Sequence, residues 1–240
     1  MPRGPLEGMT FSADPSASPD VPILSRLLGM LSLLRTDSCE LCGETSFLQD
    51  ELGGFCGPCV EDILSAPGPF LLESSPRVWA AREYSGEMVQ AIRVLKNPGH
   101  RKAAPVLADL LLRPLYRKLQ ESWMTEDDLV VVPVPASPAG RRSRGFDQAR
   151  LLGRALSSRE ALLVKRSRGR AQKVLSREER RENAGSHFSP SRRIPPEAVP
   201  RRVVLVDDVV TTGATIGRCG KILQELGVEE WGALLLAVRL

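Results

Sequence analysis

The sequence has few cysteines and no long hydrophobic run. Five cysteines among 240 residues are too few for a small scaffold held together by disulfides. No apolar run reaches the roughly 18 residues that a spanning helix needs, so we expect no integral membrane protein. The region after Met1 lacks the apolar core and small-residue cleavage site of a secretory signal. We therefore expect a protein of the reducing cytoplasm.

The charges are unevenly distributed along a chain of otherwise ordinary composition. Hydrophobic residues make up 42% and charged residues 26% of the sequence, which is typical of a globular protein. The formal net charge of +4 hides a basic block at residues 139–202, which carries +12 against −8 for the rest. Such a block is either a solvated face or a surface for a phosphate-bearing ligand or nucleic acid.

Three regions follow one another along the chain. Residues 1–20 are rich in Pro, Gly, Ser and Asp without apolar periodicity, and we expect a disordered tail. Residues 21–69 contain an amphipathic helix predicted over Val21–Leu34, then a cysteine module, and end at the linker Ala66–Pro69. Residues 70–240 are predicted to form the main domain.

The main domain alternates strand and helix patterns. An edge strand is predicted at Val78–Tyr84, and helices at Glu87–Lys96, Lys102–Gln120 and Asp147–Ser158. Further segments complete the pattern: strands at Leu129–Val132, Val203–Val206 and Ala233–Val238, and a helix at Ala214–Leu226. Apolar strands that alternate with helices predict an α/β fold, in which helices cover both faces of a parallel sheet.

The cysteine module has the spacing of a metal site. Cys39-Glu-Leu-Cys42 and Cys56-Gly-Pro-Cys59 are two C-x-x-C pairs separated by 13 residues, as in paired knuckles that hold one structural zinc through four thiolates. Gly43 and Gly57 are expected at tight turns that bring backbone N–H groups to the sulfurs. An iron site is the main alternative; a redox pair or two disulfides fit four evenly spaced thiols poorly. The separate Cys219 is expected to be a small buried side chain.

A second motif joins a strand, two carboxylates and a hydroxyl-rich loop. The run Val203–Val206 leads into Asp207 and Asp208, and Thr211-Thr212-Gly213-Ala214-Thr215 then opens a helix. Backbone N–H groups at a helix N-terminus favour a phosphate, and threonine hydroxyls add donors. The carboxylates suit the two hydroxyls of a ribose and a nearby divalent cation. The motif therefore predicts a ribose 5-phosphate site, with an ordinary strand-to-helix turn as the alternative.

This motif resembles the phosphoribosyl diphosphate (PRPP) motif of type I phosphoribosyltransferases, and other stretches resemble the ComF family. Val132-Pro-Val-Pro135 and Arg144-Gly-Phe-Asp-Gln-Ala149 are similar to its "PVP … RGFNQA" signature. The cysteine module and Ala91–Lys96 also occur in the family's order. A later pattern of that family matches Gln172, Leu175, Arg180, Asn183 and Phe188. The resemblance implies a zinc ribbon followed by a type I phosphoribosyltransferase-like domain, with a role in DNA uptake during competence.

The resemblance also implies roles for individual residues. Asp207 and Asp208 would meet the ribose diol and Mg²⁺ as the catalytic pair. The 5-phosphate loop would comprise Val209, Val210, Thr211, Thr212, Gly213, Ala214 and Thr215. Candidates for the pyrophosphate and the flap over it are Ser137, Arg141, Arg144, Arg170, Arg180 and Arg181. Asp147 departs from the family's asparagine, and because a carboxylate only accepts hydrogen bonds, we expect no direct phosphate contact from it.

Two classes of function remain open at this point. An enzyme would displace pyrophosphate from C1 of PRPP with a nitrogen nucleophile, through positioning and positive charge and without a protein nucleophile. A binding protein would sense PRPP or hold single-stranded DNA on its basic block, where arginines and lysines pair with phosphates. The aromatic residues of that block are Phe146 and Phe188, and two are too few for a stacking platform.

Overall fold

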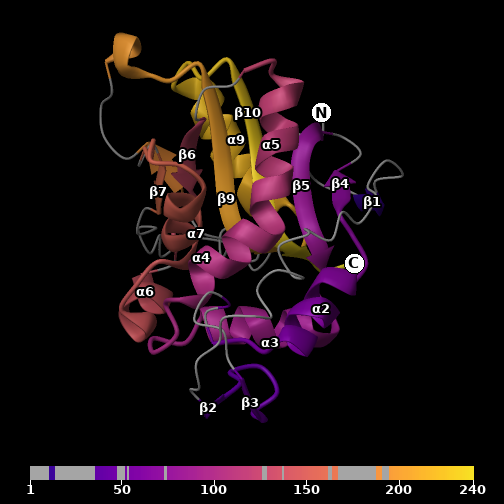
Figure 1. Ribbon diagram of the computed structural model, residues 1–240. Coiled ribbons are helices and arrows are strands. Elements are labelled where there is room, and N and C mark those ends of the chain that lie inside the picture. The colour runs from indigo at the N-terminus through magenta and orange to yellow at the C-terminus, as the bar shows by residue number, and fades with distance from the viewer. Residues whose placement is uncertain are drawn as a thin grey trace, which may run out of the picture.

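A computed structural model describes residues 11–13, 36–47, 52, 54–72, 75–125, 129–136, 138–161, 164–166, 188–190 and 195–240. A six-stranded sheet forms the centre, in the order β1-β4-β5-β10-β9-β6 (Figure 1). Its strands are β1 (Phe11–Ala13), β4 (Phe70–Leu72), β5 (Ser75–Glu83), β10 (Glu230–Val238), β9 (Arg202–Val210) and β6 (Val130–Pro133). The last four in sheet order run parallel, whereas β1 and β4 are antiparallel to their neighbours.

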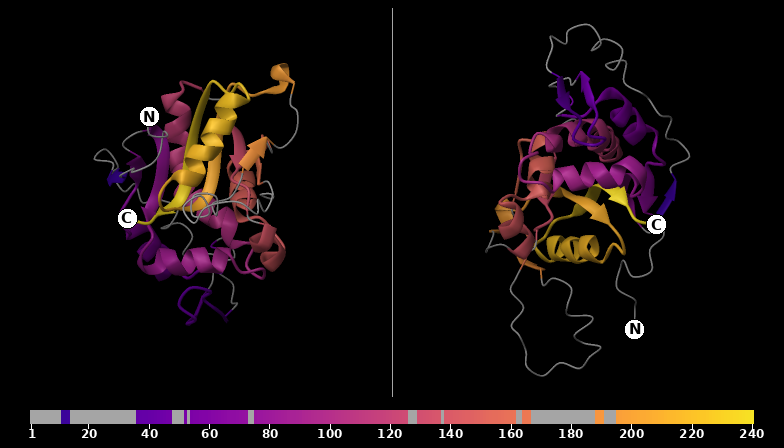
Figure 2. Two further views of the ribbon diagram at one scale, coloured as in Figure 1. Left: turned by 180° about the vertical axis from the view of Figure 1, so that it is seen from behind. Right: turned by 90° about the horizontal axis from the view of Figure 1, so that it is seen from below.

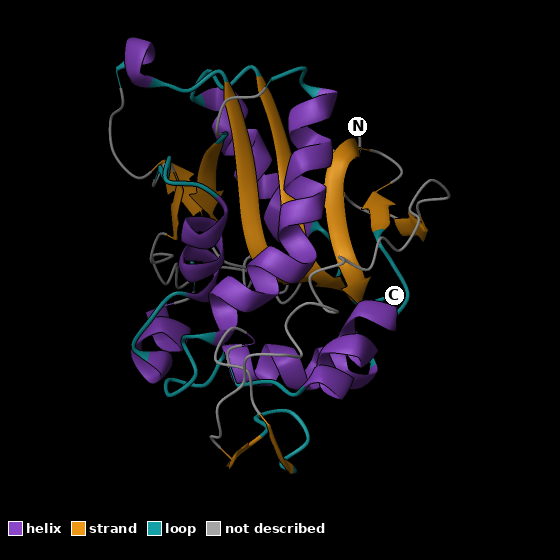
Figure 3. Cartoon of the chain, viewed as in Figure 1, coloured by secondary structure: helices purple, strands orange, loops and turns teal. Residues whose placement is uncertain are grey.

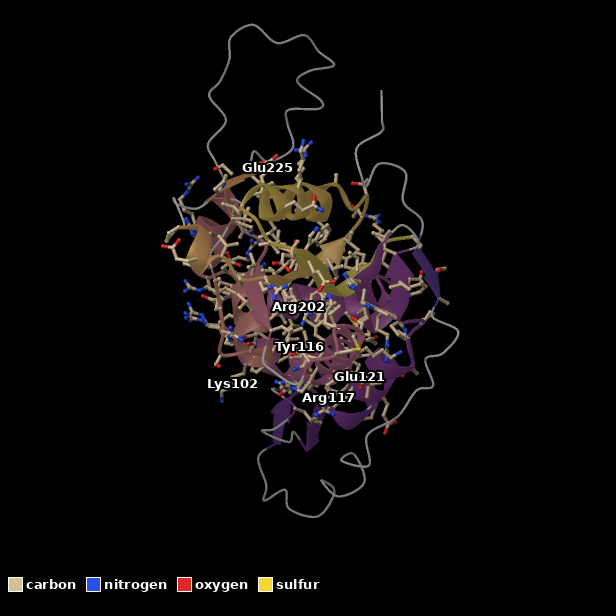
Figure 4. All side chains as sticks on the ribbon, turned by 90° about the horizontal axis from the view of Figure 1, so that it is seen from above. Lys102, Tyr116, Arg117, Glu121, Arg202 and Glu225 are labelled. Carbon is tan, nitrogen blue, oxygen red and sulfur yellow. The ribbon has the colours of Figure 1, made fainter. Side chains whose placement is uncertain are left out.

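Helices cover both faces of this sheet. On one face lie α3 (Gly86–Leu95), α4 (Ala103–Leu107), the π-helical η3 (Ala108–Leu112), α5 (Arg113–Ser122) and α7 (Gln148–Leu156). On the other face lies α9 (Ala214–Glu225). Figure 2, seen from below, shows α9 and α3 on opposite sides of the sheet, and Figure 4 shows Glu225 and Tyr116 on opposite sides of Arg202. The predicted α/β class with a parallel sheet covered on both faces is confirmed.

The alternation of side chains along the strands explains this two-sided core. In β9, Val204 and Val206 pack with the α3–α7 face, while Val203 and Leu205 pack with α9. All four are completely buried. Because successive residues of a strand point to opposite faces, a strand that is apolar at every position needs cover on both sides. Cys219 of α9 is also completely buried, as predicted.

The cysteine module lies beside the carboxyl ends of the parallel strands. It contains the hairpin β2 (Thr36–Ser38) and β3 (Thr45–Phe47), which Figure 1 shows below α3, and the helix α2 (Gly57–Ser65). The Arg82 guanidinium of β5 donates to the carbonyls of Ile63 and Leu64, at 3.2 and 2.9 Å. Those carbonyls belong to the last turn of α2, where they find no N–H donors within the helix. One side chain thus fastens the module's helix to the sheet.

Smaller elements complete the described chain, as the helices and strands of Figure 3 show. They are α6 (Pro138–Arg144), the antiparallel pair β7 (Val164–Arg166) and β8 (Phe188–Pro190), and the 3₁₀ turn η4 (Pro196–Ala198). Among the residues that are described, no helix has both the length and the apolar character needed to cross a membrane.

The structure corrects several sequence-based expectations. The edge-strand prediction for Val78–Tyr84 is wrong, because β5 is an interior strand with β4 on one side and β10 on the other. The helix predicted over Lys102–Gln120 is divided by the π turn η3, which ends two residues before Pro114. Proline lacks an N–H and its ring crowds the preceding turn, which accounts for the change of register. Within the expected tail, β1 pairs with β4. The helix expected at Val21–Leu34 lies outside the described residues.

Candidate functional site

The acidic pair lies within a strand and faces a lysine. Asp207 and Asp208 belong to β9, which continues to Val210 instead of ending before them as the sequence suggested. The Lys96 Nζ, at the C-terminal end of α3, lies 2.8 Å from Asp208 Oδ2. Backbone N–H groups bind the carboxylates as well: that of Asp208 donates to Asp207 Oδ1 at 2.9 Å, and that of Val209 to Asp208 Oδ1 at 2.7 Å. Both carboxylates therefore have fixed orientations.

The electrostatics of Asp207 make the pair receptive to a cation. Burial raises the pKa of Asp207 well above its ordinary value, and the neighbouring Asp208 and Asp147 raise it further. The Asp208 N–H and the Lys96 ammonium act in the opposite direction without cancelling the rise. Two adjacent carboxylates, one of them costly to ionise, are oxygen ligands that a hard divalent cation such as Mg²⁺ would stabilise. The donor set thus fits Mg²⁺.

The loop after β9 forms the start of α9. Gly213 caps the helix with φ 70° and ψ −8°, a left-handed conformation that glycine adopts without steric cost. The Thr212 hydroxyl accepts from the Ala214 N–H at 3.5 Å, and Thr211 and Thr212 are exposed. The first backbone N–H groups of a 12-residue helix therefore lie next to the end of the strand that carries the acidic pair.

A cavity of about 200 Å³ is lined by the acidic pair and by Thr215, whereas residues 209–214 of the loop are not part of its lining. Its polar lining comes from five elements or their ends, and comprises Lys96, Arg144, Asp147, Gln148, Asp207, Asp208 and Thr215. The Arg144 Nε is buried without a hydrogen-bond partner in the described part of the chain. The Asp147 carboxylate, in contrast, accepts two backbone hydrogen bonds. It accepts from the Arg150 N–H at 3.3 Å and the Ala136 N–H at 3.4 Å, so it caps α7 and holds the loop after β6.

The cavity gathers some of the predicted site residues and not others. Asp207, Asp208, Thr215 and Arg144 line it. Arg141 is exposed on α6 and is not part of the lining. The remaining pyrophosphate and flap candidates lie outside the described residues, and they are Ser137, Arg170, Arg180 and Arg181.

Sequence reasoning did not assign Lys96 to the site. A lysine at the end of an amphipathic helix is ordinarily solvated, so its residue type carries no signal. The segment Ala91–Lys96 did belong to the stretches that resemble the ComF family. That resemblance was the available signal, and the 2.8 Å contact with Asp208 supplies its physical meaning.

The four cysteines of the module meet at one point. Their sulfur atoms all lie within 4.8 Å of one another, and Cys42 Sγ is 3.9 Å from Cys56 Sγ. Zinc–sulfur bonds of about 2.3 Å in a tetrahedron put sulfurs about 3.8 Å apart, so the four thiols fit a zinc ion. Gly43 adopts φ 76° at the first turn, as predicted. Gly57 does not form a tight turn; it is the first residue of α2.

Backbone N–H groups favour a thiolate at this centre. The N–H groups of Leu41 and Cys56 donate to Cys39 Sγ at 3.4 and 3.3 Å. Burial alone would raise the pKa of Cys39, but backbone N–H groups lower it to about 7. Burial raises the pKa of Cys56 and of Cys59, which also lie beside the other thiols. A metal that accepts four sulfurs would remove this conflict among crowded, buried thiols.

Curated proteins similar to the chain share one theme in their names. "Competence protein F" of Haemophilus influenzae is 36% identical over 135 residues, covering 51% of this chain and 58% of that protein. "Competence protein ComFC" of Streptococcus pneumoniae is 32% identical over 123 residues, covering 51% and 54%. The resemblance to the ComF family is thereby confirmed. This ComF-like chain also resembles "DNA utilization protein YhgH" of Escherichia coli (strain K12), with 29% identity over 205 residues, 80% of this chain and 88% of that protein.

The matches with the two competence proteins cover only part of each chain. The ComF-like chain spans somewhat more than half the length of the two competence proteins. No protein-family model matches it. A solved structure titled "Structure of the allosteric regulatory enzyme of purine biosynthesis" is 24% identical and covers 59% of this chain and 25% of its own, with a TM-score of 0.32. A similarity of that size carries no weight for function.

Proposed function

We propose that this ComF-like chain binds PRPP together with Mg²⁺ in the cavity between β9, α3 and the start of α9. The observation that carries the proposal is the position of Asp207 and Asp208 in one cavity with Thr215 and with the buried Arg144 Nε, which has no hydrogen-bond partner among the described residues. Carboxylates suit hydroxyl groups and a divalent cation, and a helix N-terminus and an arginine suit phosphates. PRPP carries both kinds of group: a ribose diol lies between a 5-phosphate at one end and a diphosphate at the other.

Each part of the ligand has partners of suitable chemistry. The carboxylates of Asp207 and Asp208 accept hydrogen bonds from the ribose diol. The backbone N–H groups of residues 211–215, with the threonine hydroxyls, receive the 5-phosphate, and Arg144 faces the diphosphate. Mg²⁺ would be held beside the acidic pair, where it neutralises diphosphate charge.

The same arrangement supports group transfer to a nitrogen acceptor. The bond between C1 and the diphosphate oxygen breaks and pyrophosphate leaves with its electron pair. The acceptor nitrogen forms a bond to C1 and releases its proton to water. The protein contributes no nucleophile; Asp207 and Asp208 orient the ribose and Arg144 stabilises the departing charge. We place this activity in the cytoplasm and, from the names of its relatives, in the handling of DNA during competence.

Calorimetric titration of the zinc-loaded protein with PRPP and Mg²⁺ tests the proposal. Asp207→Asn and Asp208→Asn keep the size of each side chain, and each should lose about 1.5–3 kcal/mol of binding free energy, the worth of a hydrogen bond to a charged group. Asp62→Asn, which removes the same charge from an exposed position on α2, is the matched control. Absence of binding by the wild type at millimolar PRPP, or equal affinities of the acidic-pair variants and the wild type, would overturn the proposal.

A second candidate function is single-stranded DNA binding by the basic block. Arg141 and Arg142 are exposed on α6, where they are available to phosphates. Phe146 is buried and lies under the Arg101 guanidinium at 5.3 Å, which removes it from base stacking. Contacts to the backbone alone would therefore carry the affinity.

Salt dependence tests this second function. Fluorescence anisotropy with a labelled oligothymidylate should show affinity that falls steeply with salt, and a smaller slope for the variant R141Q/R142Q. The variant R93Q/R117Q removes two exposed arginines outside the block and should keep the wild-type slope. A slope near zero for the wild type would exclude this function.

A further inference from the structure

We propose that the cysteine module positions Lys96 in the ligand cavity, through a contact between Glu40 and His100. In this arrangement Lys96 contacts the site directly, and His100 is a positioning residue that acts through it. The proposal rests on the proposed function in taking the cavity as a PRPP site. It gives the module a role in ligand binding in addition to its role in stability.

The turn between α3 and α4 connects the two sites within five residues. Lys96 and Asn97 directly follow α3, and their N–H groups donate to carbonyls of its last turn at 2.9–3.1 Å. The His100 N–H donates to the Asn97 carbonyl at 3.1 Å, and the Gly99 N–H to Asn97 Oδ1 at 3.3 Å. The Ala103 N–H donates to the His100 carbonyl at 3.1 Å, where α4 begins. Because these hydrogen bonds tie the turn to α3 on one side and to α4 on the other, a shift at one end is transmitted to the other.

Three side chains of this turn reach three different parts of the protein. Lys96 contacts Asp208 in the cavity. His100 Nδ1 lies 2.5 Å from Glu40 Oε1, in the cysteine module, although the two do not meet the angles of a regular hydrogen bond. The Arg101 guanidinium stacks on the ring of Phe146, 5.3 Å from its centre, next to the cavity residue Asp147. The turn therefore connects the module with two walls of the cavity.

Glu40 is held firmly on the module side. It stands between the ligand candidates Cys39 and Cys42, and its N–H donates to the Gly54 carbonyl at 3.0 Å. Its side chain packs against Gly54 so closely that a Cβ there would lie 2.9 Å from the carboxyl carbon. The second oxygen, Oε2, is buried with no hydrogen-bond partner among the described residues. The contact with His100 is thus the polar contact that the structure shows for this carboxylate within the described chain.

The position of Lys96 matters because it sets the charge in the cavity. Its ammonium partly compensates Asp208, beside an Asp207 that is already costly to ionise. A phosphorylated sugar brings more negative charge to the same place, so a lysine held at this position favours its entry. When the turn loses its hold on the module, Lys96 spends less time at Asp208 and the cavity becomes more repulsive to the ligand.

A double-mutant cycle on the full-length, zinc-loaded protein tests the coupling. PRPP affinity with Mg²⁺ is measured for wild type, H100A, K96M and H100A/K96M, and zinc content is measured for each. We expect H100A to keep its zinc and to lose affinity about fivefold or more, the usual lower range of coupling between sites. In the K96M background the same substitution should change affinity by less than half of that factor. K102A, at an exposed position next to the turn, is the matched control and should bind as the wild type does (Figure 4).

Amide hydrogen exchange of the ligand-free proteins gives a second readout that needs no PRPP. H100A and Glu40→Gln should each speed exchange in residues 207–210, and K96M should abolish this difference. If H100A leaves both affinity and exchange at residues 207–210 unchanged, or acts equally with and without Lys96, the inference is wrong. If the wild type binds no PRPP while the exchange pattern appears, the proposed ligand fails but the coupling stands. If H100A does not fold, Glu40→Gln provides the same comparison from the module side.

Discussion

Comparing Gly213→Ala with Gly227→Ala distinguishes an effect on ligand binding from an effect on the stability of α9. Gly213 begins α9 with φ 70°, and Gly227 follows the end of the same helix with φ 96°. A Cβ in the left-handed region costs about 1–2 kcal/mol. For a domain of 150–250 residues each kcal/mol lowers the melting temperature by about 2–4 °C, so each glycine-to-alanine variant should melt about 2–8 °C below the wild type.

The two variants should differ in ligand binding. Gly213 stands where the chain would receive the 5-phosphate, whereas Gly227 lies at the opposite end of α9, where a Cβ has no neighbour within 4 Å. We expect Gly213→Ala to lose PRPP affinity by about tenfold or more, equivalent to 1.4 kcal/mol, and Gly227→Ala to bind as the wild type does. Differential scanning fluorimetry and calorimetry measure the two effects. Equal affinities of the two variants would refute the assignment of this loop to the phosphate.

Three further predictions concern the metal, the acidic pair and the attachment of the module. The purified protein should contain about one zinc per chain by elemental analysis, and Cys39→Ser should lower that content; iron in its place, or four freely reactive thiols, would contradict this. The raised pKa of Asp207 means that the folded state keeps a proton that the unfolded state has lost, so the ligand-free protein loses stability as pH rises from the ordinary aspartate value toward the raised one. Asp207→Asn should therefore melt above the wild type at pH 7–8 without ligand, and a lower melting temperature there would disprove the sign. Arg82→Met should destabilise the protein by about 1.5–3 kcal/mol, because it leaves carbonyls of α2 without donors, and denaturant titration should detect the loss.

Local patterns identified the strands that are apolar throughout, but not their neighbours. The run Val203–Val206 predicted a buried strand, and it lies in the first half of β9. The strand continues through Asp207 to Val210 because β10 pairs with it at Leu235 and Val238, some 28 residues away. Pairing over such distances leaves no trace in the local composition. The interior position of β5 was missed for the same reason, since β4 has only three residues.

The candidate site divides in a similar way. Asp207, Asp208 and the threonine loop are contiguous and could be predicted as one motif. Lys96 and Arg144 come from α3 and α6, and only the folded chain brings them to the same cavity. The cysteine cluster was predictable because the spacing of four identical ligands is itself a signal, whereas the contact of Glu40 with His100 joins two residues with no motif in common.

The order of the strands in the sheet has a consequence for synthesis of the chain. Strand β10 lies between β5 and β9 and pairs with both, yet it follows both in sequence. While a ribosome is making residues 84–229, β5 has no parallel partner, and the backbone N–H and C=O groups along that edge are unpaired. Such edges pair with other chains, and their late closure raises contact order and slows folding. The emerging chain therefore depends on protection of β5, by its own helices or by a chaperone, until β10 emerges and closes the sheet.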